Sequence, residues 1–105
     1  MTPKETAIST VEKFFELLGC KVQVDDYWEK RRFMNGFVWD YRERCTISAS
    51  SFKHSPDTIN VNVYDLDDDA ERENILNIRS TGPELAAKFT QEAINAYEQE
   101  LEVQE

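Results

Sequence analysis

Near both ends of the chain, apolar residues recur every three or four positions, which predicts two amphipathic helices. The first begins in a T-P-x-E segment, where Thr2 can cap the helix and Glu5 can complete a capping box. Gly19 supplies its stop signal. The second follows Thr81-Gly82-Pro83-Glu84. The apolar positions are Ala7, Ile8, Val11, Phe14, Phe15 and Leu18 in the first helix, and Leu85, Phe89, Ala93, Ile94, Tyr97 and Leu101 in the second.

Between the helices the apolar period changes to two, which is typical of strands. Asn35-Gly36 is the dipeptide that most readily forms a two-residue turn, so it predicts a hairpin in which Met34 faces Phe37. This register would pair Arg31 with Asp40 and Glu29 with Arg42 on one face. The other face would be mainly aromatic and would cover the helices, through Trp28, Met34, Phe37, Trp39, Tyr41, Cys45 and Ile47.

Two further strands are predicted in the second half of the chain. A turn at 54–57 precedes Ile59, Val61 and Val63, which alternate with polar residues, and we interpret 74–79 as a strand as well. The chain is therefore predicted to be an α+β protein of order α-β-β-β-β-α. Its antiparallel four-stranded meander would carry the N-terminal and C-terminal helices on one face. At 105 residues it is expected to form a single domain, 1–105, with 98–105 as a frayed acidic tail.

Composition narrows the class of protein. No segment is apolar and long enough to cross a bilayer, and charged residues interrupt the start where a secretory signal would lie, so we expect a cytoplasmic protein without membrane contact. Cys20 and Cys45 show no CxxC spacing and are expected to be reduced core thiols.

Charge is unevenly distributed along the chain, whose net charge is −9. Nearly all of the excess acid lies in residues 56–105, and the densest cluster follows Asp65. Asp65, Asp67 and Asp69 imitate an EF-hand, but Ala70 stands where the loop needs glycine and Leu76 where it needs glutamate. We therefore predict a solvated turn, and we expect no metal site and no cofactor.

The leading hypothesis is a non-enzymatic protein that engages a basic surface of a protein partner. Its sharper form is an inhibitor that mimics DNA and occupies a nucleic-acid-handling protein, because closely spaced carboxylates resemble a phosphate backbone. Small size, high acidity and the lack of a catalytic motif are shared by phage-encoded inhibitors and toxin immunity proteins. The predicted partner-binding residues are Asp65, Asp67, Asp68, Asp69, Glu71, Glu73 and Glu92.

The alternative hypothesis is a nucleic-acid-binding module that uses the basic aromatic hairpin 27–44. It requires four arginines to lie on one open surface, whereas the predicted register would neutralise Arg31 and Arg42. Arg32 beside Trp39 would likewise form an internal cation–π pair. The candidate residues are Arg31, Arg32, Arg42, Arg44 and Trp28.

Catalytic signatures are lacking in the sequence. There is no GxSxG around a serine, no dinucleotide or P-loop motif, and His54 is expected to be a surface turn residue. The order of one helix, a strand meander and a closing helix resembles the frataxin architecture in element order alone. No residue role is carried over from that resemblance.

Overall fold

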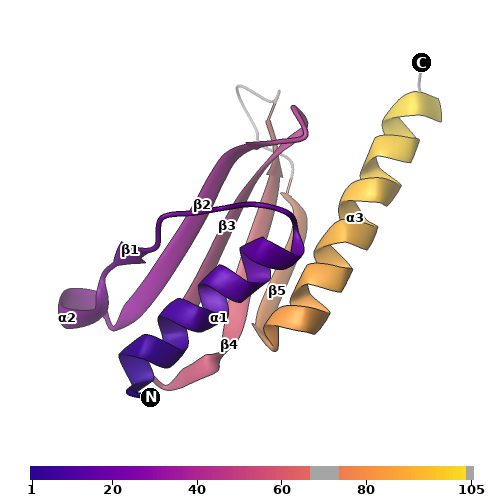
Figure 1. The fold of residues 1–105 in the computed structure, drawn as a ribbon. Coiled ribbons are helices and arrows are strands. Elements are labelled where there is room, and N and C mark those ends of the chain that lie inside the picture. Colours follow the sequence, from indigo (N-terminus) through magenta and orange to yellow (C-terminus); the bar gives the residue numbers. More distant parts are fainter. Residues whose placement is uncertain (67–73, 104–105) are drawn as a thin grey trace.

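One antiparallel sheet carries two long helices on the same face in the computed structural model, which describes residues 1–66 and 74–103 (Figure 1). The strands follow one another in chain order across the sheet. The helices are α1 (Pro3–Leu17), α2 (Trp28–Arg31) and α3 (Pro83–Val103). The strands are β1 (Asp25–Asp26), β2 (Phe33–Tyr41), β3 (Cys45–Phe52), β4 (Ser55–Asp65) and β5 (Asn74–Thr81).

The α+β architecture with a helix at each end is as predicted, and the sheet has five strands instead of four. The additional strand, β1, contains two residues and pairs with the start of β2. Residues 28–31, which the sequence pattern placed in a strand, form the short helix α2. No described helix has the length and apolarity that a bilayer crossing requires.

Helix α1 forms as its sequence predicts. The Thr2 hydroxyl accepts a hydrogen bond from the backbone N–H of Glu5, whose carboxylate accepts one from the Thr2 N–H. Residue 19 ends the helix with φ of 80°, a conformation that glycine adopts without strain. At the other end of the chain, α3 extends from Pro83 to Val103, so the described part of the predicted acidic tail is helical.

The predicted turn at Asn35-Gly36 is wrong, and the register that it implied is wrong too. Both residues lie inside β2, where Asn35 pairs with Ser50 and Gly36 pairs with Ala49 of β3. The chain reverses instead at residues 42–44, and Arg42 and Glu43 adopt the positive φ values of that turn.

Close packing of α1 explains why a glycine occupies the middle of β2. A Cβ atom at Gly36 would lie 2.6 Å from Cε2 of Phe15 and 2.7 Å from Cγ1 of Val11. Even a methyl group there would displace these two side chains, because α1 crosses the sheet directly over this backbone. The role of Gly36 is therefore to let α1 approach β2 closely, and it does not form a turn.

The core lies between the sheet and the two helices. Helix α1 contacts β2, β3 and β4, and α3 contacts β4 and β5. Alternate residues of β4, Ile59, Val61 and Val63, are fully buried, as the alternation predicted. The same face receives Phe14, Phe15, Met34, Ile47 and Ile94.

None of the described helices covers the opposite face of the sheet (Figure 1). Phe37 and Trp39 belong to this open face and are 42% and 59% exposed, so the prediction that they cover the helices is wrong. The reason is the register: with Gly36 and Met34 turned toward α1, the residues that alternate with them point the other way.

Candidate binding surfaces

The acidic residues of the predicted partner-binding set fall in different environments. Asp65 ends β4 and is only 8% exposed, and it accepts a hydrogen bond from the Tyr97 hydroxyl of α3. Its carboxylate therefore joins the sheet to the helix layer. Glu92 is exposed on α3. Asp67, Asp68, Asp69, Glu71 and Glu73 lie outside the described residues, so their partner-binding role stays a prediction.

Helix α3 contacts the rest of the molecule through small residues. Its buried positions are Ala86, Ala87, Thr90 and Ile94. Leu85 and Phe89, which periodicity placed on the buried face, are 47% and 41% exposed instead. Alanines at the contact let the helix approach the sheet closely, and this rotates the larger side chains outward.

The orientation of α3 is fixed by polar contacts on the side that faces α1. Lys13 of α1 forms an ion pair with Glu84, and its ammonium group lowers the pKa of that carboxyl through a hydrogen bond. Further along, Gln91 donates a hydrogen bond to the Leu17 carbonyl oxygen at 3.3 Å. Near the end of α3, Arg42 of the β2–β3 turn donates to Asn95 at 2.9 Å and lies 3.8 Å from Glu98.

The side of α3 that faces away from α1 carries a mixed stripe, which we call the α3 flank. Positions 85, 89, 92, 96 and 103 fall on one side of the helix by its 3.6-residue repeat. A shallow hollow near the helix end is lined by Ala96, Gln99, Glu100 and Val103. Apolar contact area and carboxylates thus lie together on the α3 flank, which we define as Leu85, Phe89, Glu92, Ala96, Glu100 and Val103.

The arginines of the predicted hairpin lie at two ends of β2. Arg31 and Arg32 precede the strand, and Arg42 and Arg44 follow it in the turn to β3. Nine strand residues separate the two pairs, which is roughly 30 Å of extended chain. Trp28 is 9% exposed and belongs to the core cluster. The structure therefore divides this set into two pairs of arginines and a buried tryptophan, and nucleic-acid binding by the whole set stays a prediction.

The partners predicted for these arginines, Asp40 for Arg31 and Glu29 for Arg42, are wrong because the register that paired them is not formed. Among the described residues, the ion pairs are Lys4 with Asp26, Lys13 with Glu84, and Arg42 with Glu98. Arg42 lies over the ring of Tyr41, with 5.1 Å from its guanidinium carbon to the ring centroid. Arg31 takes part in none of these contacts.

The open sheet face combines amides, hydroxyls and aromatic rings. Asn35 accepts hydrogen bonds from Ser50 at 2.8 Å and from Ser48 at 3.4 Å, and Asn62 pairs with Ser48 and Asn77 on the neighbouring strands. Rings lie toward both ends of the face. Phe37 and Trp39 form one group, and Phe33 and Phe52 belong to the other.

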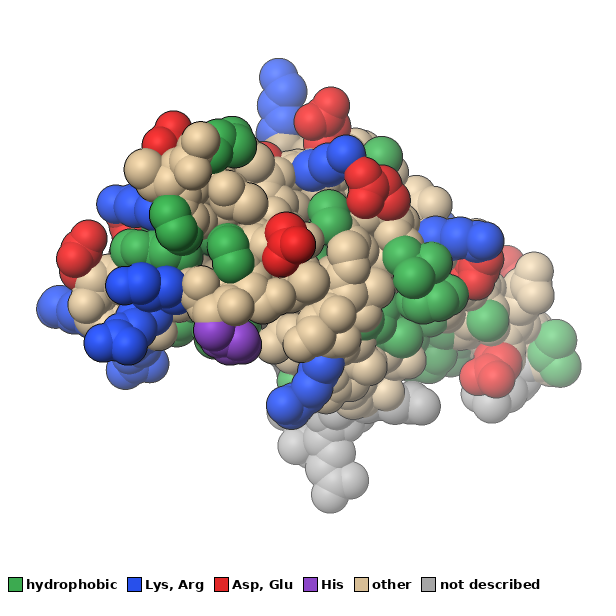
Figure 2. All heavy atoms as spheres, turned by 90° about the horizontal axis from the view of Figure 1, so that it is seen from below, with side chains coloured by type: hydrophobic (Ala, Val, Ile, Leu, Met, Phe, Trp, Pro, Cys, Tyr) green, Lys and Arg blue, Asp and Glu red, His purple; other side chains and the backbone are tan. Residues whose placement is uncertain are grey.

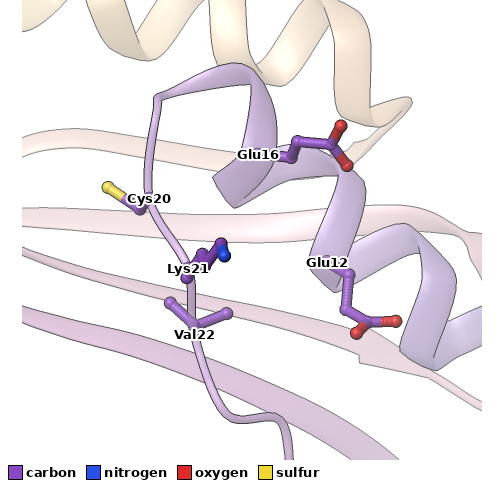
Figure 3. A pocket seen from close by; sticks show the side chains of 5 residues that line it. All are labelled: Glu12, Glu16, Cys20, Lys21 and Val22. Atoms are coloured by element: carbon purple, nitrogen blue, oxygen red, sulfur yellow. The ribbon is translucent and has the colours of Figure 1, made fainter.

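Both cysteines are free thiols, as predicted, and neither has the properties of an activated nucleophile. Burial raises the pKa of Cys20, and it raises that of Cys45 to about 12 with help from Glu98. Cys20 borders a hollow of about 390 Å³ with Lys21, Val22, Glu12 and Glu16. The two glutamates point away from Cys20 (Figure 3), so no base converges on the thiol.

In the described part of the chain, no group of three His, Cys, Asp or Glu side chains comes together in a way that could hold a metal ion. Comparison with family models, curated proteins and solved structures gives no match. Function must therefore be inferred from this chain's own residues.

Proposed function

We propose that this chain is a non-enzymatic binding protein that engages a basic surface of a protein partner through the α3 flank. The observation that carries the proposal is the exposure of Leu85 and Phe89 beside Glu92 on one helix side. Carboxylates steer a basic partner toward the helix, and buried apolar area then holds it.

The chemistry of the flank favours a basic partner. Glu92 and Glu100 border the exposed apolar residues, while Lys88, the one basic residue of α3, lies nearer the α1 side of the helix. Asp67, Asp68, Asp69, Glu71 and Glu73, predicted from the sequence to bind the same partner, would add to the attraction of a basic partner. Inhibition of a nucleic-acid-handling protein by mimicry of its ligand remains the sharper form of the proposal.

The α3 flank also supplies exposed apolar side chains, which a cluster of acidic residues lacks. Exposed charge pairs contribute little binding energy and weaken at high salt. Aromatic residues in desolvated pockets carry most of the energy of typical interfaces. Phe89 is placed to be such an anchor, with Leu85 one helical turn away.

A matched pair of variants tests the proposal. Phe89→Ser and Phe37→Ser remove the same side chain at nearly equal exposure, 41% and 42%, from opposite faces of the molecule. Tagged wild type, Phe89→Ser and Phe37→Ser are used to capture partners from the native host's lysate at low salt. Dissociation constants are then measured with the purified partner.

We expect a basic protein that binds wild type and Phe37→Ser equally but binds Phe89→Ser at least tenfold more weakly. Glu92→Gln together with Glu100→Gln should slow association and reduce its salt dependence, with a smaller effect on dissociation. Equal binding by Phe89→Ser, or loss of binding only in Phe37→Ser, would contradict the proposal.

A further inference from the structure

Four aromatic rings form a continuous row at one end of the open sheet face. Successive ring centroids from Tyr27 to Phe33, Phe52 and His54 are 5.0, 5.3 and 5.8 Å apart. Direct pairing of Phe33 with Phe52 across β2 and β3 holds the middle of this aromatic row in place. Tyr27 reaches it from the start of α2, and His54 from the β3–β4 turn.

Three cationic side chains surround the end of the aromatic row. Arg31, Arg32 and Lys53 line a hollow of about 310 Å³ together with Phe52 and His54. The Lys53 N–H donates to the Arg32 carbonyl oxygen at 2.9 Å, and this bond joins the two chain segments that carry the cations. In Figure 2 the blue Lys and Arg side chains lie beside the purple His54 at this end of the molecule.

These cations remain available to a ligand. All three are exposed, and none takes part in an ion pair with a described residue. Asp26, the carboxylate closest in sequence to Tyr27, is held by the Lys4 ammonium group at 2.9 Å and by the Trp28 N–H at 2.9 Å. Lys4 also lowers the pKa of Asp26. The residues that line the hollow include three cations and no carboxylate, although Glu29 lies on the same short helix as Arg31.

We infer that the aromatic row and its three cations bind a short segment of single-stranded nucleic acid. Exposed bases stack on aromatic rings, and guanidinium and ammonium groups bind the phosphates that connect them. Several rings in succession match several nucleotides of a strand, whereas a single nucleotide would use one ring. This site is independent of the α3 flank, and it differs from the hairpin set by excluding Arg42, Arg44 and Trp28.

The glutamates of the two long helices lie away from this site. The glutamates of α1 and α3 belong to the helix layer, and the sheet separates that layer from the open face (Figure 1). Exposed charges farther apart than roughly 10 Å are screened at 0.1 M salt. A strand on the aromatic row therefore interacts mainly with the three nearby cations.

The test is fluorescence anisotropy with a labelled ten-nucleotide thymidine strand in about 50 mM salt. Phe52→Leu keeps an apolar side chain but removes the stacking ring, and Phe37→Leu is its control at the other end of the sheet. Arg31→Gln with Lys53→Gln removes two of the cations. Lys88→Gln with Arg44→Gln is the charge control, because it also removes two positive charges but at positions away from the hollow. Thermal unfolding checks that each variant is folded.

We expect wild type to bind the strand, Phe52→Leu to weaken binding about fivefold or more, and Arg31→Gln with Lys53→Gln to abolish most of it and flatten the salt dependence. Both controls should bind like wild type. No binding by wild type, equal loss in the controls, or equal affinity for thymidine monophosphate or for a duplex of the same length would overturn the inference.

Discussion

Tyr97 of α3 donates a hydrogen bond to the carboxylate of Asp65, the last residue of β4. This contact fixes the C-terminal half of α3 against the end of an inner strand of the sheet. It also holds Asp65, the first residue of the acidic segment, in a buried position.

Tyr97→Phe should therefore lower the free energy of unfolding by about 1 to 3 kcal/mol, because a hydrogen bond to a mostly buried carboxylate is lost. Urea unfolding measures the change. Tyr64→Phe, on the open face of β4, is the control and should lose less than about 0.5 kcal/mol. Equal losses in the two variants would show that the Asp65 contact contributes nothing specific.

Gly36→Ala should destabilise the protein by about 1 to 3 kcal/mol, because its Cβ would overlap the side chains of Phe15 and Val11. Gly82→Ala is a suitable comparison, since a Cβ there meets no atom within 4 Å. The loss at Gly82 should be smaller and limited to weaker helix capping. If both substitutions cost the same, α1 does not pack on β2 as described.

Stability should fall between about pH 9 and pH 12 through Cys45. Its folded pKa is raised from 9.0 to about 12, so over this range the unfolded thiol has released its proton while the folded thiol retains it. The unfolded state then binds fewer protons, and the free energy of unfolding decreases as pH rises. Cys45→Ala should flatten this slope relative to wild type in urea titrations at several pH values. A slope unchanged by the substitution would exclude Cys45 as its source.

Asp67, Asp68 and Asp69 changed together to Asn should slow association with a basic partner and leave the fold intact. The reason is long-range: three fewer negative charges weaken steering without removing an apolar contact. Stopped-flow association rates at two salt concentrations, with circular dichroism as the folding control, measure both effects. Wild-type rates in the triple variant would remove these residues from the binding surface.

Local signals in the sequence predicted the local structure well. Thr2 and Glu5 cap α1 as expected because the whole capping box lies within four residues. Alternation at Ile59, Val61 and Val63 identified β4 because one face of that strand is buried against the helices. Neither feature depends on where distant segments pack.

Features that depend on distant packing were missed. Asn35-Gly36 has the composition of a turn, but contact with Phe15, twenty residues earlier, decides its conformation. Once β2 continues through Gly36, Phe33 pairs with Phe52, and Lys53 comes next to Arg32. This register brings the aromatic row and its cations together. The sequence pattern could not show this, because the residues belong to segments that are far apart along the chain.

Packing distance also explains the error on α3. Periodicity treats Leu85 and Phe89 as core because they are large and apolar, whereas Ala86, Ala87 and Thr90 occupy the contact. Small residues at a helix–sheet interface are the signal that would have found the exposed flank. When a helix packs on a sheet, two adjacent alanines between larger apolar residues indicate that the alanines form the contact and the larger residues are exposed.

The two-residue strand β1 affects how copies of this protein meet one another. A full-length edge strand would offer a row of unpaired backbone groups to a second molecule, whereas β1 offers only those of Asp25 and Asp26. Because β1 pairs only with Met34 and Asn35, residues 36–41 of β2 have no described strand partner on this side of the sheet. This stretch of backbone is where an added strand from another molecule could extend the sheet.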